Sequence, residues 1–351
     1  MRVARHGPVQ PAAQDRKMRF IALVLVAAAL SMQAGAASPE ASSNAKACMT
    51  GATKPVKDSR IREAIANARK QHALFGGQLI DLAGRVVAVG FHEAEFDRPA
   101  GESTPTWARV AEFWAALDED LPSTFRSPAG ALVDRKRLFE QIAASSQAGG
   151  VSRLDEKQLS AVGAAFLRSA LVDQPWSAAF ISFLMKQSNF SKDEFEFSDS
   201  HVDYVDKAVL SSSAEARGEP VEYAYRACDV ASTRPRQGDM ICYTRDSAAG
   251  IDSHAKLLAH LEMRRSVGSA APVPMHCELV TSSDENGNAK IETIGGNVVQ
   301  SVTLRRMTLN ATKTLSRTYF ATRRSPVCTQ GNSCSGNLSR NRWVVLLQFR
   351  N

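Results

Sequence analysis

The segment DQPWSAAFISFLM, residues 173–185, carries the clearest helix signal in the chain. Asp173 is a candidate N-cap, and Pro175 stands in the first turn, where a missing N–H costs nothing. After it, apolar residues recur at the spacing of one helix face, from Trp176 to Leu184. The pattern predicts a buried helix whose first turn carries Ser177.

The sequence differs in character on the two sides of this helix. Helical patterns occur at residues 60–74, at 107–114, near 134–144, at 155–172 and near 201–210. A hairpin turning at Ala83-Gly84 is predicted over 78–89. Strand patterns follow at 239–244, 276–281, 290–293, 298–304 and 343–349. Helices followed by strands predict an α+β domain, with N-terminal helices packed on an antiparallel sheet. Residues 245–274 form a long insertion, helical around 255–264, of the kind typical of a lid or binding loop.

The first 37 residues have the composition of a secretory signal peptide. A basic stretch ending at Arg19 precedes an apolar run from Phe20 to Leu30, and small residues follow. The run is short of the ~20 residues that a membrane-spanning helix needs, although a retained anchor is the alternative. We therefore expect a periplasmic or secreted protein with no stable membrane span after signal removal. Residues 38–57 are predicted to be a disordered linker, and 58–351 a single domain, with a helical and hairpin part at 58–150 and a motif-bearing core at 173–310.

Charge and cysteine content limit the classes of partner and cofactor. The net charge of +7 includes the basic signal segment, and no nucleic-acid module is recognised, so we expect no nucleic-acid partner. The six cysteines form no C-x-x-C pair, and no histidine stands at zinc-finger spacing, so we expect neither a metal nor another cofactor. An exported protein can form disulfides. Cys328 and Cys334 could close a small ring, while Cys242 and Cys277 are either a second bridge or two buried thiols.

Three polar residues follow one another in an order that suits nucleophilic catalysis. Ser177 stands at a helix N-terminus, where free N–H groups create a positive potential. His276 opens a strand and could take the proton of the hydroxyl, and Asn297 could orient the imidazole. Each has a structural alternative: a first-turn serine, a partly exposed strand histidine, and an asparagine in a Gly-Gly turn or bulge.

Further candidates for contact with a substrate are Trp176, His201, Tyr204 and Glu278. His201 and Tyr204 stand one turn apart on the same predicted helix face and could line a groove, although a pair on the helix surface is the alternative. Glu278 shares a strand face with His276 and could replace Asn297 as its orienting carboxylate.

Four blocks of sequence carry a resemblance to a known family: PWSAAFIS at 175–182, GDMICY at 238–243, HCELV at 276–280 and IGGNV at 294–298. They resemble the domain of unknown function 2272 family of bacterial envelope proteins. Their order is also similar to that of papain-like cell-wall hydrolases, including the CHAP amidohydrolases and peptidases. The resemblance implies a papain-like cysteine-peptidase-type fold, with Ser177 as nucleophile, His276 as base and Asn297 as orienter.

The chain departs from that wider superfamily at the nucleophile, where Ser177 replaces a cysteine. A hydroxyl is a poor nucleophile unless a base removes its proton during attack, and serine enzymes more often use a carboxylate as third residue. The leading hypothesis is an envelope hydrolase that cleaves an amide in the peptide part of peptidoglycan. The alternatives are a catalytically inactive module that binds cell-wall peptides or a protein partner, and an acyltransferase or esterase.

Overall fold

A computed structural model of the 351-residue chain describes residues 39–117, 155–172, 174–245, 250–268, 273–321 and 336–351, with residues 140, 141, 144 and 248. The predicted signal peptide lies outside these residues, as do Asp173, most of the predicted helix near 134–144, and the loop that contains Cys328 and Cys334. No helix in the described part is long and apolar enough to cross a membrane.

The helices of the described part fall mainly where hydrophobic periodicity predicted them. They are α1 (Pro39–Ala52), α2 (Ser59–Leu74), α3 (Thr106–Ala115), α5 (Glu156–Leu171), α6 (Ser177–Gln187), α7 (His201–Ala216) and α8 (His254–Ser266), with short 3₁₀ turns η2 (Glu285–Gly287) and η3 (Arg317–Tyr319). Local signals set several starts: Asp58 caps α2, and Asp155 with Gln158 forms a capping box on α5. α8 is the helix predicted inside the insertion, and Leu257 and Leu261 bury one side of it.

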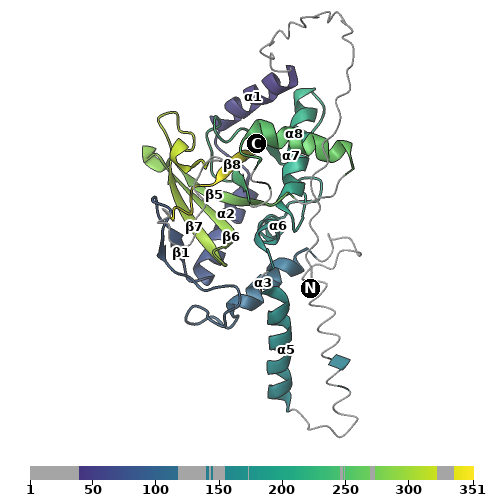
Figure 1. Ribbon diagram of the computed structural model, residues 1–351, viewed down its shortest axis with the longest axis vertical. Coiled ribbons are helices and arrows are strands. Elements are labelled where there is room, and N and C mark those ends of the chain that lie inside the picture. Colours follow the sequence, from purple (N-terminus) through teal and green to yellow (C-terminus); the bar gives the residue numbers. More distant parts are fainter. Residues whose placement is uncertain are drawn as a thin grey trace, which may run out of the picture. The chain divides into compact units, whose positions relative to one another are not determined.

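One mixed sheet of eight strands forms the centre of the domain (Figure 1). Its strands are β1 (Gln78–Ile80), β2 (Val86–Ala88), β3 (Tyr225–Cys228), β4 (Met240–Thr244), β5 (Met275–Ser283), β6 (Lys290–Val298), β7 (Ser301–Thr308) and β8 (Arg342–Phe349). Their order is β2-β1-β7-β6-β5-β4-β8-β3, and every pairing is antiparallel except that of β1 with β7. The described residues therefore form an α+β fold with a mostly antiparallel sheet, as the sequence predicted.

Two clusters of buried side chains lie on the two faces of the sheet. Helices α2, α3, α6, α7 and α8 contribute to the larger cluster, which includes Cys277 and Leu279 of β5. The smaller cluster includes Tyr243 and Val280, and it is covered by the segment around Leu315. Because side chains alternate along a strand, His276 and Glu278 share the face of Val280, opposite that of Cys277.

Residues 39–52 correct the expectation of a disordered linker, because they form α1. A disulfide joins Cys48 to Cys228 of β3, and the side chain of Gln348 donates a hydrogen bond of 2.9 Å to the Cys48 carbonyl. These long-range connections hold a segment whose own composition is too polar and small to bury much surface.

The second possible bridge, which the sequence left open, is formed. Cys242 and Cys277 face each other across β4 and β5 and are disulfide-bonded, with their Cα atoms 4.1 Å apart. No cysteine in the described part of the chain is free. The bridge ties the neighbouring strands β4 and β5 together directly beside His276.

Candidate functional site

α6 begins at Ser177, and the residue before it fixes this end of the helix. The Trp176 side chain is fully buried among Phe75, Phe113 and Phe180. Its indole N–H donates a 2.6 Å hydrogen bond to Oε2 of Glu93, which is also buried. We expected Trp176 to contact substrate, but it has no exposed surface and acts as a core anchor that positions the start of α6.

Gly295 and Gly296 allow β6 to lie close to α6 on one face of the strand and to His276 on the other. A Cβ atom on Gly296 would lie 2.6–2.7 Å from atoms of Phe180 and Trp176. A Cβ on Gly295 would lie 2.8 Å from Nε2 of His276. The register of β6 against β7 shifts just after these glycines, where a bulge was predicted. The two glycines are therefore required by close approach on both faces of the strand.

The hydroxyl of Ser177 is hydrogen bonded to an imidazole, and that imidazole belongs to His201. Ser177 Oγ lies 2.7 Å from His201 Nε2. The other ring nitrogen, Nδ1, is in hydrogen-bond contact with the hydroxyl of Tyr204. His201 opens α7, and Tyr204 follows one turn later, so the predicted His-x-x-Tyr pair does act together. Both are buried, however, rather than on the helix surface.

The chemistry of this chain of three groups depends on which ring nitrogen carries the proton. If Tyr204 accepts a hydrogen bond from Nδ1–H, Nε2 has a free lone pair and can take the proton of Ser177. If Tyr204 donates to Nδ1, Nε2 carries the proton and cannot act as a base. The tyrosine hydroxyl is therefore the group that selects the tautomer of His201.

His276 lies beside this pair, but it does not contact the serine hydroxyl as predicted. Its ring centroid is 5.2 Å from that of His201, with the rings nearly perpendicular. Neither ring nitrogen of His276 has a hydrogen-bond partner among the described residues, and the side chain is fully buried. The physical reason is its position on β5, where its side chain is directed to the face of Tyr243 and Glu278.

Glu278 belongs to a buried ionic network behind His276. Its Oε1 lies 3.5 Å from His276 Nε2. Arg305 binds both of its carboxylate oxygens at 2.9–3.1 Å, and Thr293 donates a hydrogen bond of 2.5 Å to Oε2. Burial raises the pKa of Glu278, but Arg305 and His276 lower it by more than burial raises it. The net pKa lies well below its ordinary value, so the carboxyl group stays ionised. Glu278 is thus the polar neighbour of His276. The sequence analysis considered it for this position as an alternative to Asn297.

The side chain of Asn297 is hydrogen bonded to neither histidine. Its side chain is only partly buried, and its amide nitrogen donates a 3.4 Å hydrogen bond to the carbonyl of Gln174. Its φ of +53° falls in the left-handed region that asparagine tolerates. Asn297 was predicted to orient the imidazole of His276. In the structure it is a turn residue beside the segment that leads into α6.

Both imidazoles are in their neutral form at neutral pH. Burial lowers the pKa of His201 well below its ordinary value, and the nearby His276 and Arg245 lower it further. For His276, burial and then the Arg245 guanidinium lower the pKa to about 4, against the opposing effect of Glu278. A neutral imidazole is the form that can accept a proton from a hydroxyl.

Arg245, Arg305 and Glu93 are site residues that the sequence analysis missed. Arg245 follows β4 and is half-buried, whereas Ser177 and His201 are each only 4% exposed. The signal for Arg245 was its place directly after the predicted strand at 239–244. No comparable pattern marked Arg305 or Glu93, which lie in segments far apart in the chain. No group of residues suited to bind a metal occurs in the described part of the chain.

Comparison with known protein families gives a match over most of the chain. The model of a bacterial family described as "Uncharacterized protein conserved in bacteria (DUF2272)" matches residues 101–349. No curated protein and no solved structure matches the chain. The matched region contains Ser177, His201, His276 and Arg245, and it extends over more than half of the sequence. The chain therefore belongs to the DUF2272 family.

Proposed function

We propose that the protein is an exported hydrolase that cleaves an amide bond by acyl transfer, with Ser177 as nucleophile and His201 as general base. The observation that carries the proposal is the 2.7 Å contact between Ser177 Oγ and His201 Nε2 at the N-terminus of α6. The helix end supplies a positive potential where negative charge would develop, and the neutral imidazole is ready to take a proton. This assignment replaces His276 by His201 as the base.

The proposed reaction has two balanced steps. In the first, Ser177 Oγ bonds to the carbonyl carbon, its proton moves to His201 Nε2, and the imidazolium gives that proton to the departing amine. In the second, water attacks the acyl-enzyme and gives a proton to the same nitrogen, which returns it to the serine oxygen as the acid leaves. Tyr204 holds Nδ1–H throughout and so keeps Nε2 available.

The substrate proposed is an amide in the peptide part of the cell wall, and the fold proposed is a variant of the papain-like arrangement. The support for both is the resemblance of the four sequence blocks, together with a nucleophile at a helix start against an antiparallel sheet. Export is supported by the signal-like first 37 residues. In this variant the serine replaces a cysteine, and a helix histidine, His201, has replaced the strand histidine, His276, as the contact of the nucleophile.

A second candidate function is a non-catalytic module that binds cell-wall peptides or a protein partner. The observation that favours it is burial, because Ser177 and His201 are each only 4% exposed and a substrate carbonyl must reach the hydroxyl. In that case the serine–histidine contact is a structural hydrogen bond that satisfies two buried polar groups.

Digestion of purified cell walls separates the two functions. We expect the wild-type protein to release peptide fragments with new amino groups, and the Ser177→Ala and His201→Gln variants to release about 10²–10⁴-fold less. Asn297→Gly is the matched control, because the Asn297 side chain makes only an exposed contact with a backbone carbonyl and glycine accepts the left-handed backbone at this position. Equal release by wild type and Ser177→Ala would remove the serine mechanism. Activity only in Ser177→Cys would identify a disabled thiol hydrolase that retains a binding role.

A further inference from the structure

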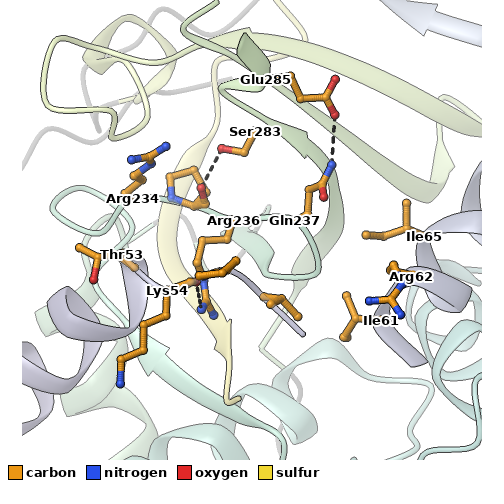
Figure 2. A pocket seen from close by; sticks show the side chains of 14 residues that line it. Thr53, Lys54, Ile61, Arg62, Ile65, Arg234, Arg236, Gln237, Ser283 and Glu285 are labelled. Atoms are coloured by element: carbon orange, nitrogen blue, oxygen red, sulfur yellow. Dashed lines mark hydrogen bonds between the residues drawn. The ribbon is translucent and has the colours of Figure 1, made fainter. Parts of the chain in front are cut away.

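A hollow of about 380 Å³ lies between the end of α1, the start of α2 and the turn before β4 (Figure 2). Ser283, one of its lining residues, ends β5, whereas His276 is near the start of that strand. At about 3.3 Å per residue along a strand, the hollow is roughly 20 Å from His276. It is therefore separate from the serine–histidine site.

A buried arginine fixes the wall of this hollow. Arg236 is 8% exposed and pairs with the fully buried Asp239 at 3.0 Å. Its Nη1 donates hydrogen bonds of 2.9 and 3.0 Å to the carbonyls of Gly51 and Lys54. These bonds hold the chain that follows α1 against the sheet, and the Cys48 disulfide holds α1 itself. The hollow is thus preformed, which reduces the entropy lost on binding.

The charged side chains that line the hollow are mainly cationic. They comprise Lys54, Arg62, Arg234 and Arg236, against a single acid, Glu285. Asp239 neutralises Arg236, and Asp284 lies 3.3 Å from Arg234. In contrast, neither Lys54 nor Arg62 makes an ion pair with any carboxylate in the described part of the chain, and both are exposed. Arg62 Nη1 donates a 3.2 Å hydrogen bond to the carbonyl of Lys57, which leaves its charge unpaired. Two cations therefore remain available to an anionic ligand.

The arrangement of these two cations indicates the shape of the ligand. Figure 2 shows Lys54 and Arg62 on opposite sides of the hollow, with Ile61 and Ile65 on the wall beside Arg62. A compact anion such as phosphate is held best where several donors converge on one point. Separated cations with apolar surface nearby suit instead a chain that carries more than one carboxylate on aliphatic stems.

We propose that this hollow binds an acidic peptide, with carboxylates at Lys54 and Arg62 and aliphatic stems against Ile61 and Ile65. Glu285, the one acid of the lining, accepts a 3.1 Å hydrogen bond from Gln237 Nε2. The proposal concerns a binding site remote from Ser177, and it stands whether or not the serine is catalytic.

Titration with two blocked tripeptides, Glu-Ala-Glu and Gln-Ala-Gln, tests the proposal on the mature chain by calorimetry or NMR. We expect the acidic peptide to bind and its neutral analogue to bind at least about tenfold more weakly. The double variant Lys54→Ala/Arg62→Ala should weaken binding of the acidic peptide by roughly 2–30-fold, the effect of losing two exposed ion pairs. Lys70→Ala, which removes an exposed cation of the same helix α2 outside the hollow, should bind like wild type.

Three results would overturn the proposal. Equal binding of the two peptides would show that charge is not recognised, and unchanged binding by the double variant would place the peptide elsewhere. Displacement of the peptide by an equal concentration of inorganic phosphate would identify a compact-anion site instead. Circular dichroism of each variant shows that the fold is retained, which is expected because both substituted side chains are exposed.

Discussion

Replacing His276 by glutamine should remove a large part of the acid sensitivity of the fold. His276 is fully buried, and its pKa falls from 6.5 in the unfolded chain to about 4 in the folded protein, chiefly through burial and then through Arg245. The folded state therefore binds this proton less readily than the unfolded chain, and stability rises with pH across that window. His276→Gln keeps a polar side chain but cannot titrate.

The magnitude follows from the pKa shift. Between about pH 8 and about pH 5, a histidine whose pKa drops from 6.5 to about 4 makes the folded state less stable by roughly 2 kcal/mol. Chemical denaturation of wild type and variant at both pH values gives the free energy of unfolding in each case. We expect wild type to lose about 2 kcal/mol more than His276→Gln over this range.

The comparison uses the change with pH and not the absolute stability, so a general effect of the substitution cancels. His260→Gln, on α8, is the control for removal of a histidine outside the site. A wild-type protein that loses no more free energy of unfolding than His276→Gln would refute the reasoning, because the buried imidazole would then not be held neutral.

Three other predictions follow from the site and its surroundings. Arg245→Gln removes a cation that lowers the pKa of both imidazoles, so NMR titration should show both pKa values rising; unchanged values would place the guanidinium too far away. Gly296→Ala forces a Cβ against α6 and should lower stability by about 1–3 kcal/mol, whereas Gly336→Ala, in open space, should have little effect in the same denaturation assay. Replacing Cys242 and Cys277 by serine removes a bridge across 35 residues and should lower the free energy of unfolding by about 3–4 kcal/mol; a variant as stable as the oxidised wild type would contradict this.

The elements of the fold were largely predictable because their signals are local. The apolar spacing of α6, the capping residues of α5 and the glycine turn between β1 and β2 are all read within a few residues of sequence. The missed strand β3 has only four residues, too few for a pattern. α1 was taken for a disordered linker because its stabilisation depends on Cys228, which is 180 positions from Cys48.

The residues of the candidate site could be named from the sequence, but the contacts between them could not. The sequence singled out Ser177, His201, Tyr204 and His276, and these four do lie together. It paired Ser177 with the wrong ring, because a strand histidine and a helix histidine look equally available when no distance is known. Which face of β5 carries a side chain depends on the register with β4, and the sequence does not display that register.

The rate at which a fluorophosphonate, a reagent for activated serine hydroxyls, modifies Ser177 tests the central claim most directly. Mass spectrometry of the peptide that contains Ser177 should show the adduct in wild type and in Asn297→Gly, and none in Ser177→Ala. His201→Gln should slow the modification by about 100-fold or more, because the base that removes the proton is gone. A folded wild type that is not modified, or a His201→Gln variant modified as fast as wild type, would contradict the assignment of Ser177 and His201 as nucleophile and base.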